Sequence, residues 1–125
     1  MIKSYKDLVV WQKSVDLVVE TYKLTKLFPK EEMFGLTSQM RRSSVSVASN
    51  IAEGFSRKYN QGFKQFIRIA LGSGAELETQ IILSDKLKLV DSKNLEKASA
   101  LVTEVMKMLN SLNKYLTINH KSLTN

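Results

Sequence analysis

The sequence contains no cysteine, one proline and five glycines among its 125 residues. The absence of cysteine excludes disulfide bonds and thiolate metal sites. Because proline and glycine are the main residues that interrupt helices and form turns, their scarcity favours a few long helices over many short strands. The only histidine is His120, and no Glu-x-x-His pair of the kind used by di-iron bundles occurs. We therefore predict a protein with no metal site and no cofactor.

Long apolar segments are also missing. No run approaches the roughly 18 consecutive apolar residues that a membrane-spanning helix needs. The first residues, MIKSY, lack the apolar core of a signal peptide. These two absences predict a cytoplasmic protein that does not cross a membrane.

What is present is typical of one folded domain, with 43% hydrophobic and 25% charged residues. Apolar residues recur at helical spacing in four segments. The predicted helices cover residues 7–28, 34–53, 60–89 and 92–118, and short connections join them. The sequence therefore predicts an all-α, antiparallel up-down four-helix bundle over residues 1–118, followed by a polar tail over residues 119–125.

The first predicted helix carries two apolar stripes, which is more than one side of a bundle needs. One stripe keeps a regular seam spacing and is interpreted as the core-facing side: Leu8, Trp11, Val15, Val18 and Tyr22. The other lies on the far side and is predicted to contact further copies of the chain: Val10, Leu17, Leu24 and Phe28. On this interpretation the protein is a homo-oligomer; the alternative is a first helix that is poorly covered in a monomer.

The second predicted helix is rich in small residues and ends at Gly54, where a left-handed C-terminal cap is expected. Small side chains allow a neighbouring helix to approach closely. Gly72 and Gly74 lie inside the third predicted helix, where each glycine costs about 1 kcal/mol relative to alanine. A close contact between these two helices would offset that cost, and a kink in the third helix is the alternative explanation. The predicted packing residues are Ser43, Ser44, Val47, Ile51, Gly72 and Gly74.

The net charge of +7 is concentrated in one region. Residues 33–75 carry six basic side chains and one acidic side chain, whereas the rest of the chain carries 13 and 11. Such a region favours a polyanionic partner, RNA or DNA. The predicted phosphate contacts are Arg41, Arg42, Arg57, Lys58, Lys64 and Arg68.

Two alternatives accompany this interpretation. Arg41 and Arg42 could instead form ion pairs with carboxylates such as Glu53, Glu76 or Glu78. The phenylalanines between the basic residues, such as Phe63, are better explained as core residues. Tyr59, in a basic connection, is the better candidate for stacking on a base.

Three segments resemble a known family. They are residues 5–14 (YKDLVVWQKS), residues 39–54 (QMRRSSVSVASNIAEG) and residues 72–80 (GSGAELETQ). In this order they are similar to the four-helix-bundle proteins encoded in intervening sequences of bacterial 23S ribosomal RNA genes. Members often have a proline at the position of Ala48, so a straighter second helix is expected here.

The resemblance implies a ring-like homopentamer without catalytic residues. It also points to a relative, the accessory variability determinant of diversity-generating retroelements, which binds a reverse transcriptase and nucleic acid. The leading hypothesis is therefore a non-enzymatic, oligomeric accessory protein that binds RNA or DNA through its basic surface. The alternatives are a protein-interaction scaffold, for example for a reverse transcriptase, and a structural product of a mobile insertion that retains no activity.

Overall fold

The computed structural model describes residues 1–119, so the predicted tail beyond Asn119 lies outside the described residues. The described residues form four α-helices and three short 3₁₀ turns. The helices are α1 (Val9–Thr25), α2 (Leu36–Phe55), α3 (Asn60–Lys86) and α4 (Glu96–Asn119). The turns are η1 (Tyr5–Asp7), η2 (Lys30–Glu32) and η3 (Ser92–Leu95).

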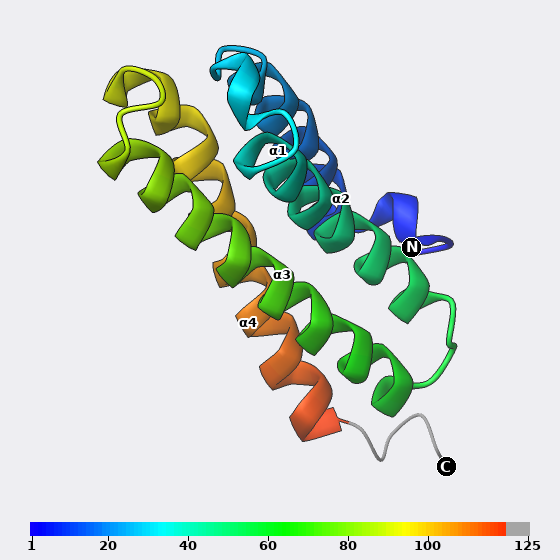
Figure 1. Ribbon diagram of the computed structural model, residues 1–125. Helices are drawn as coiled ribbons and strands as arrows, with labels where there is room; N and C mark the ends of the chain where they lie inside the picture. Colours follow the sequence, from blue (N-terminus) through cyan, green and yellow to red (C-terminus); the bar gives the residue numbers. More distant parts are fainter. Residues whose placement is uncertain (120–125) are drawn as a thin grey trace.

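The four helices run alternately up and down (Figure 1). The α1–α2 and α3–α4 connections lie at one end of the bundle, and the α2–α3 turn and the end of α4 lie at the other. Each helix packs against its two neighbours, and the most extensive contact joins α2 to α3. The predicted all-α, antiparallel four-helix bundle is confirmed.

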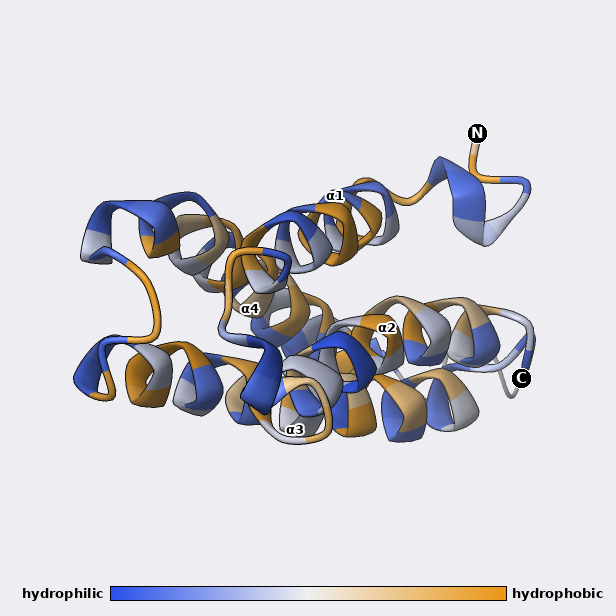
Figure 2. Cartoon of the chain, turned by 45° about the horizontal axis from the view of Figure 1, so that its top comes forward, coloured by the Kyte–Doolittle hydropathy of each residue, from blue (hydrophilic) through white to orange (hydrophobic). Residues whose placement is uncertain are grey.

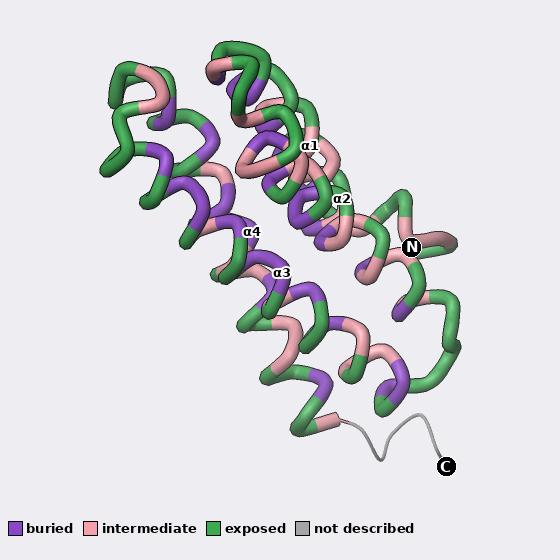
Figure 3. Tube along the Cα trace, viewed as in Figure 1, coloured by how far each residue is buried: buried purple, intermediate pink, exposed green. Residues whose placement is uncertain are grey.

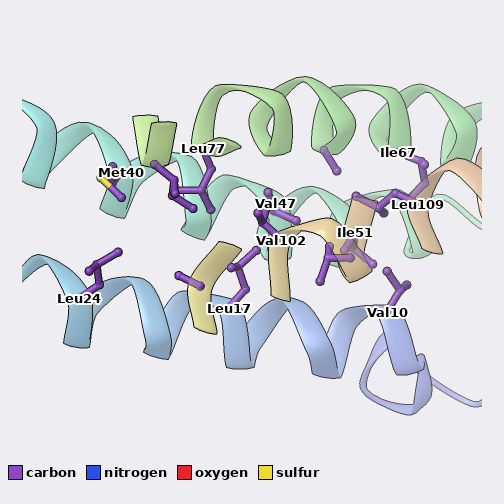
Figure 4. Close-up of a cluster of buried hydrophobic side chains, with 14 of the residues drawn as sticks. Val10, Leu17, Leu24, Met40, Val47, Ile51, Ile67, Leu77, Val102 and Leu109 are labelled. Carbon is purple, nitrogen blue, oxygen red and sulfur yellow. The ribbon is translucent and has the colours of Figure 1, made fainter. Parts of the chain in front are cut away.

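Each helix has an apolar side and a polar side (Figure 2), and the buried residues follow the apolar sides (Figure 3). Side chains from all four helices meet in one core (Figure 4). The predicted core positions Val47 and Ile51 are both fully buried. Completely buried residues of the other helices include Leu17, Ile67, Leu77 and Leu109.

The predicted oligomer stripe of α1 lies inside the bundle. Val10, Leu17 and Leu24 point from α1 toward the other helices (Figure 4), and each is at most 6% exposed. Phe28, beyond the end of α1, is 7% exposed. All four residues belong to the core of a single chain. The prediction that they contact another copy is therefore wrong.

Hydroxyl side chains explain why this face of α1 is the buried one. Ser14, Thr21 and Thr25 lie between the two apolar stripes, and all three are buried. The Thr21 hydroxyl donates to the Leu17 carbonyl at 2.8 Å, and the Thr25 hydroxyl donates to the Thr21 carbonyl at 2.8 Å. Because these hydroxyls find acceptors within their own helix, burial leaves no hydrogen bond unmade.

The α2–α3 contact depends on Gly54. A Cβ atom at this position would lie 2.8 Å from Phe66 Cβ and 2.9 Å from Phe63 Cδ1, both on α3. The helix continues through Gly54 to Phe55, and no described glycine has a positive φ. The predicted left-handed cap at Gly54 is therefore wrong, because the glycine makes room for α3. Lys58, with φ 64°, takes the left-handed conformation four residues later.

Only some of the other predicted packing residues lie in the contact between α2 and α3. Ser73 is hydrogen-bonded to Ser46 of α2 at 2.8 Å, and Ser43 and Ser44 are buried in α2. A Cβ at Gly72 would meet no atom within 4 Å, so the prediction that Gly72 packs closely is wrong. A Cβ at Gly74 would clash with the Met106 sulfur. Gly74 therefore accommodates α4, and not α2 as predicted.

We expect alanine at Gly54 and alanine at Gly72 to have opposite effects on stability. Gly54→Ala should lower the free energy of unfolding by about 1–3 kcal/mol, because the methyl group would overlap the phenylalanines of α3. Gly72→Ala should raise it by about 0.5–1 kcal/mol, because alanine favours a helix and the site is open. Urea denaturation of both variants checks this. Equal effects of the two substitutions would contradict the assigned contacts.

Candidate nucleic-acid interface

The α2–α3 turn is built on two aromatic rings. Phe55, the last residue of α2, packs edge-to-face on Phe63 of α3, with ring centroids 5.8 Å apart. Asn60, the first residue of α3, is buried, and its side-chain amide donates to the Asn119 carbonyl at 2.8 Å. The turn is thereby tied to α4, and the residues between Phe55 and Asn60 are presented at the end of the bundle.

Four cationic residues surround this turn: Arg57, Lys58, Lys64 and Arg68. We call them, with Tyr59, the basic end. Lys58 and Arg68 are exposed and Lys64 is half-buried. Among the described residues none of these three forms an ion pair. Lys64 and Arg68 line a shallow depression on α3 together with Gln61 and Gln65.

Arg57 is held more firmly than its neighbours. Its guanidinium carbon lies 4.7 Å from the centroid of the Phe66 ring. Its Nη2 atom lies 3.8 Å from a carboxylate oxygen of Glu53. The Arg57 side chain is still 45% exposed. A surface ion pair of this length contributes little to stability. Arg57 therefore remains available to an anion at the surface.

Tyr59 is an exposed aromatic residue with a fixed position. Its ring lies over Gly62, where an added Cβ would be 2.9 Å from Tyr59 Cζ. The residue is 47% exposed. Tyr59 is also the N-cap of α3 and makes no capping hydrogen bond with its side chain. The positive end of the α3 dipole therefore lies among the basic residues.

Arg41 and Arg42 lie elsewhere on α2. Fifteen residues separate Arg42 from Arg57, which corresponds to roughly 22 Å along a helix. The Arg41 guanidinium stacks over the Tyr22 ring at 4.6 Å, and its Nε donates to the buried Thr25 hydroxyl at 2.9 Å. Arg41 therefore joins α1 to α2. The structure does not bring these two arginines together with the basic end.

The charge distribution along the bundle is uneven. When each helix is divided at its middle, the half that contains the α2–α3 turn comprises residues 1–17, 46–73 and 108–119. This half carries eight basic and three acidic side chains, whereas the other described half carries ten and nine. Sequence reasoning missed that Lys3, Lys6, Lys13 and Lys114 belong to the basic half. Antiparallel alignment of the predicted helices would have revealed it.

Other kinds of site were sought in the described residues. No group of three or more histidine, aspartate or glutamate side chains there could hold a metal ion. No helix among them is long and apolar enough to cross a membrane. His120 lies outside the described residues.

The fold and the charge distribution define an all-α, antiparallel four-helix bundle with one basic end. A family model described as 23S rRNA-intervening sequence protein matches residues 6–111. The chain therefore belongs to the family of 23S rRNA-intervening sequence proteins, as its sequence motifs predicted. No curated protein matches the chain.

A solved structure supports the same assignment. It is the crystal structure of a protein of unknown function from the S23 ribosomal protein family of Bacteroides thetaiotaomicron. The two chains are 27% identical and superpose with a TM-score of 0.79. The match covers 85% of this chain and 99% of the Bacteroides chain.

Proposed function

We propose that this protein is a non-enzymatic accessory factor that binds single-stranded RNA or DNA through its basic end. The observation that carries the proposal is the concentration of net positive charge in the half of the bundle around the α2–α3 turn. Counterion release from phosphates would supply most of the affinity. Binding would therefore show little sequence preference and would weaken as salt rises.

The side chains of the basic end suit this task. Lys58, Lys64 and Arg68 have no carboxylate partner among the described residues and would contact phosphates. Tyr59 presents an aromatic ring that is already fixed on Gly62 and would stack on a base. Arg57 would add a planar donor to a phosphate. Arg41 is engaged with Tyr22 and Thr25, so we do not include it in this surface.

Charge reversal tests the proposal. The triple variant Lys58→Glu, Lys64→Glu, Arg68→Glu should lose binding to labelled single-stranded RNA and DNA. In the wild type, the slope of log affinity against log salt should be about −3 for four phosphate contacts at roughly 0.7 each. Fluorescence anisotropy at a series of salt concentrations measures both quantities.

The matched control has the same change in charge at the other end of the bundle. Lys26→Glu, Lys86→Glu, Lys93→Glu replaces three exposed lysines there. It should keep the wild-type salt slope and most of the affinity. Equal losses in the two triple variants, or no binding by the wild type at low salt, would contradict the proposal.

We also propose that the chain is a homo-oligomer, with a different interface from the predicted one. The α1 stripe interpreted as core-facing is only half-buried, and it adjoins exposed Val45 of α2. Tyr22 and Val45 line the same shallow hollow. The apolar face comprises Val15, Val18, Val19, Tyr22 and Val45.

The resemblance implies five subunits. Cyclic symmetry places equivalent residues of all copies at the same position along the rotation axis. The basic ends of all copies would therefore lie together in one ring.

Val19→Lys combined with Val45→Lys should dissociate this oligomer, because two buried charges at an interface carry a large desolvation cost. Light scattering coupled to size-exclusion chromatography measures the mass. Ile82→Lys, at an exposed position on α3, is the control and should leave the mass unchanged. A wild-type mass of 14.2 kDa at micromolar concentration would contradict self-association.

One observation favours a second function, that of a protein-interaction scaffold. Phe34 is 96% exposed in the α1–α2 connection, and two other apolar residues of that connection, Leu27 and the adjacent Met33, are also exposed. Exposed apolar clusters often contact proteins. By resemblance to the retroelement accessory determinant, a reverse transcriptase is a candidate partner. The basic end would then hold the nucleic acid on which that partner acts.

A further inference from the structure

A polar groove lies between α2 and α3, away from the basic end. Its volume is about 440 Å³, which is within the range of roughly 300–1,000 Å³ typical of small-molecule sites. Unlike most such sites, it is lined almost entirely by hydrogen-bonding side chains. They are Gln39, Arg42, Ser43, Ser46, Ser73, Glu76 and Gln80.

The hollow exists because small residues meet where the two helices pack. The Ser46 and Ser73 hydroxyls are hydrogen-bonded at 2.8 Å, and this contact sets the antiparallel register. One turn further along the groove the same register places Arg42 opposite Glu76. The next turn places Gln39 opposite Gln80. Larger side chains in place of the serines would fill the space between these pairs.

The hydrogen-bonding groups of the groove are largely unused. Gln80 is 8% exposed, and its fully buried Oε1 atom has no hydrogen-bond partner. Arg42 and Glu76 lie on facing helices, but no ion pair joins them within the described structure. A buried acceptor without a partner destabilises the protein unless something donates to it. The Oε1 atom has almost no accessible surface, so a ligand in the groove would meet other parts of the Gln80 side chain. The charged groups of Arg42 and Glu76 are the ones that it can use.

The arrangement of charge specifies the ligand. Arg42 offers a planar pair of donors that suits a carboxylate. The Glu76 carboxylate on the opposite helix is an acceptor that suits an ammonium group. One positive and one negative side chain give no net attraction for a polyanion. A second hollow shares Gln39, Glu76 and Gln80 and extends past Ala75 and Leu83, so it has room for a side chain.

We propose that this groove binds a free α-amino acid. Its carboxylate binds Arg42, and its ammonium group donates to Glu76. Its side chain enters the neighbouring hollow. The site is separate from the basic end, so nucleic-acid binding can fail without affecting it.

Nuclear magnetic resonance titration of the ¹⁵N-labelled full chain tests the proposal, with L-glutamine and L-leucine as probes. At least one of them should shift the side-chain amide signals of Gln80 and Gln39. The matched analogues N-acetyl-L-glutamine and L-glutaminamide, or those of leucine, each lack one charge. Each should bind about tenfold more weakly or worse, since each loses a charged hydrogen bond.

Two variants assign the contacts. Arg42→Gln should weaken the amino acid about tenfold and leave the binding of the amide analogue unchanged. Glu76→Gln should weaken the amino acid similarly and leave the acetyl analogue unchanged. Arg68→Gln, at the basic end, is the control and should bind like the wild type. No shift of the Gln80 amide up to about 10 mM, or equal affinities for the amino acid and its analogues, would overturn the proposal.

Discussion

The packing of α2 against α3 is the interaction on which the rest of the structure depends. Gly54 lets the end of α2 lie directly on Phe63 and Phe66, and the Ser46–Ser73 hydrogen bond fixes the register farther along. The α2–α3 turn and its cationic residues take their positions from the first contact. The polar groove takes its shape from the second. Both candidate binding surfaces therefore follow from the small residues of one helix pair.

The edges of the bundle are held by weaker contacts. Lys13 and Glu104 join α1 to α4 with a separation of 3.1 Å, and Lys97 and Glu20 do so at 3.2 Å. Both ion pairs are partly exposed to solvent, and such pairs contribute little to stability. Arg41 joins α1 to α2 through Tyr22 and Thr25. The position of α1 thus depends mainly on its buried face.

Sequence periodicity predicted the four helices, their antiparallel order and the core residues of α2. Periodicity could not show which of the two apolar stripes of α1 faces the core, because both have helical spacing. The choice depends on Thr21 and Thr25, whose hydroxyls bond to their own helix and so can be buried. Periodicity also could not show which glycines lie against a neighbouring helix. Whether Gly54 or Gly72 faces a neighbouring helix depends on rotations that only the packed structure fixes.

The candidate site was predicted only in part, because the sequence does not show which residues of different helices lie together. Lys58, Tyr59, Lys64 and Arg68 are near one another in sequence, and the turn keeps them together. Arg41 was predicted from its charge alone, whereas its role depends on Tyr22 and Thr25 of another helix. The polar groove could not be predicted, because Gln80 lies far from Arg42 in sequence and reaches the groove only through the α2–α3 register.

The central claim is that one end of the bundle binds nucleic acid. Chemical-shift mapping of the ¹⁵N-labelled protein with a short single-stranded RNA at low salt tests it most directly, because every backbone amide reports separately. The account predicts shifts that are largest at residues 57–68 and small around the α1–α2 and α3–α4 connections. Shifts spread evenly over both ends, or centred on the opposite end, would contradict it.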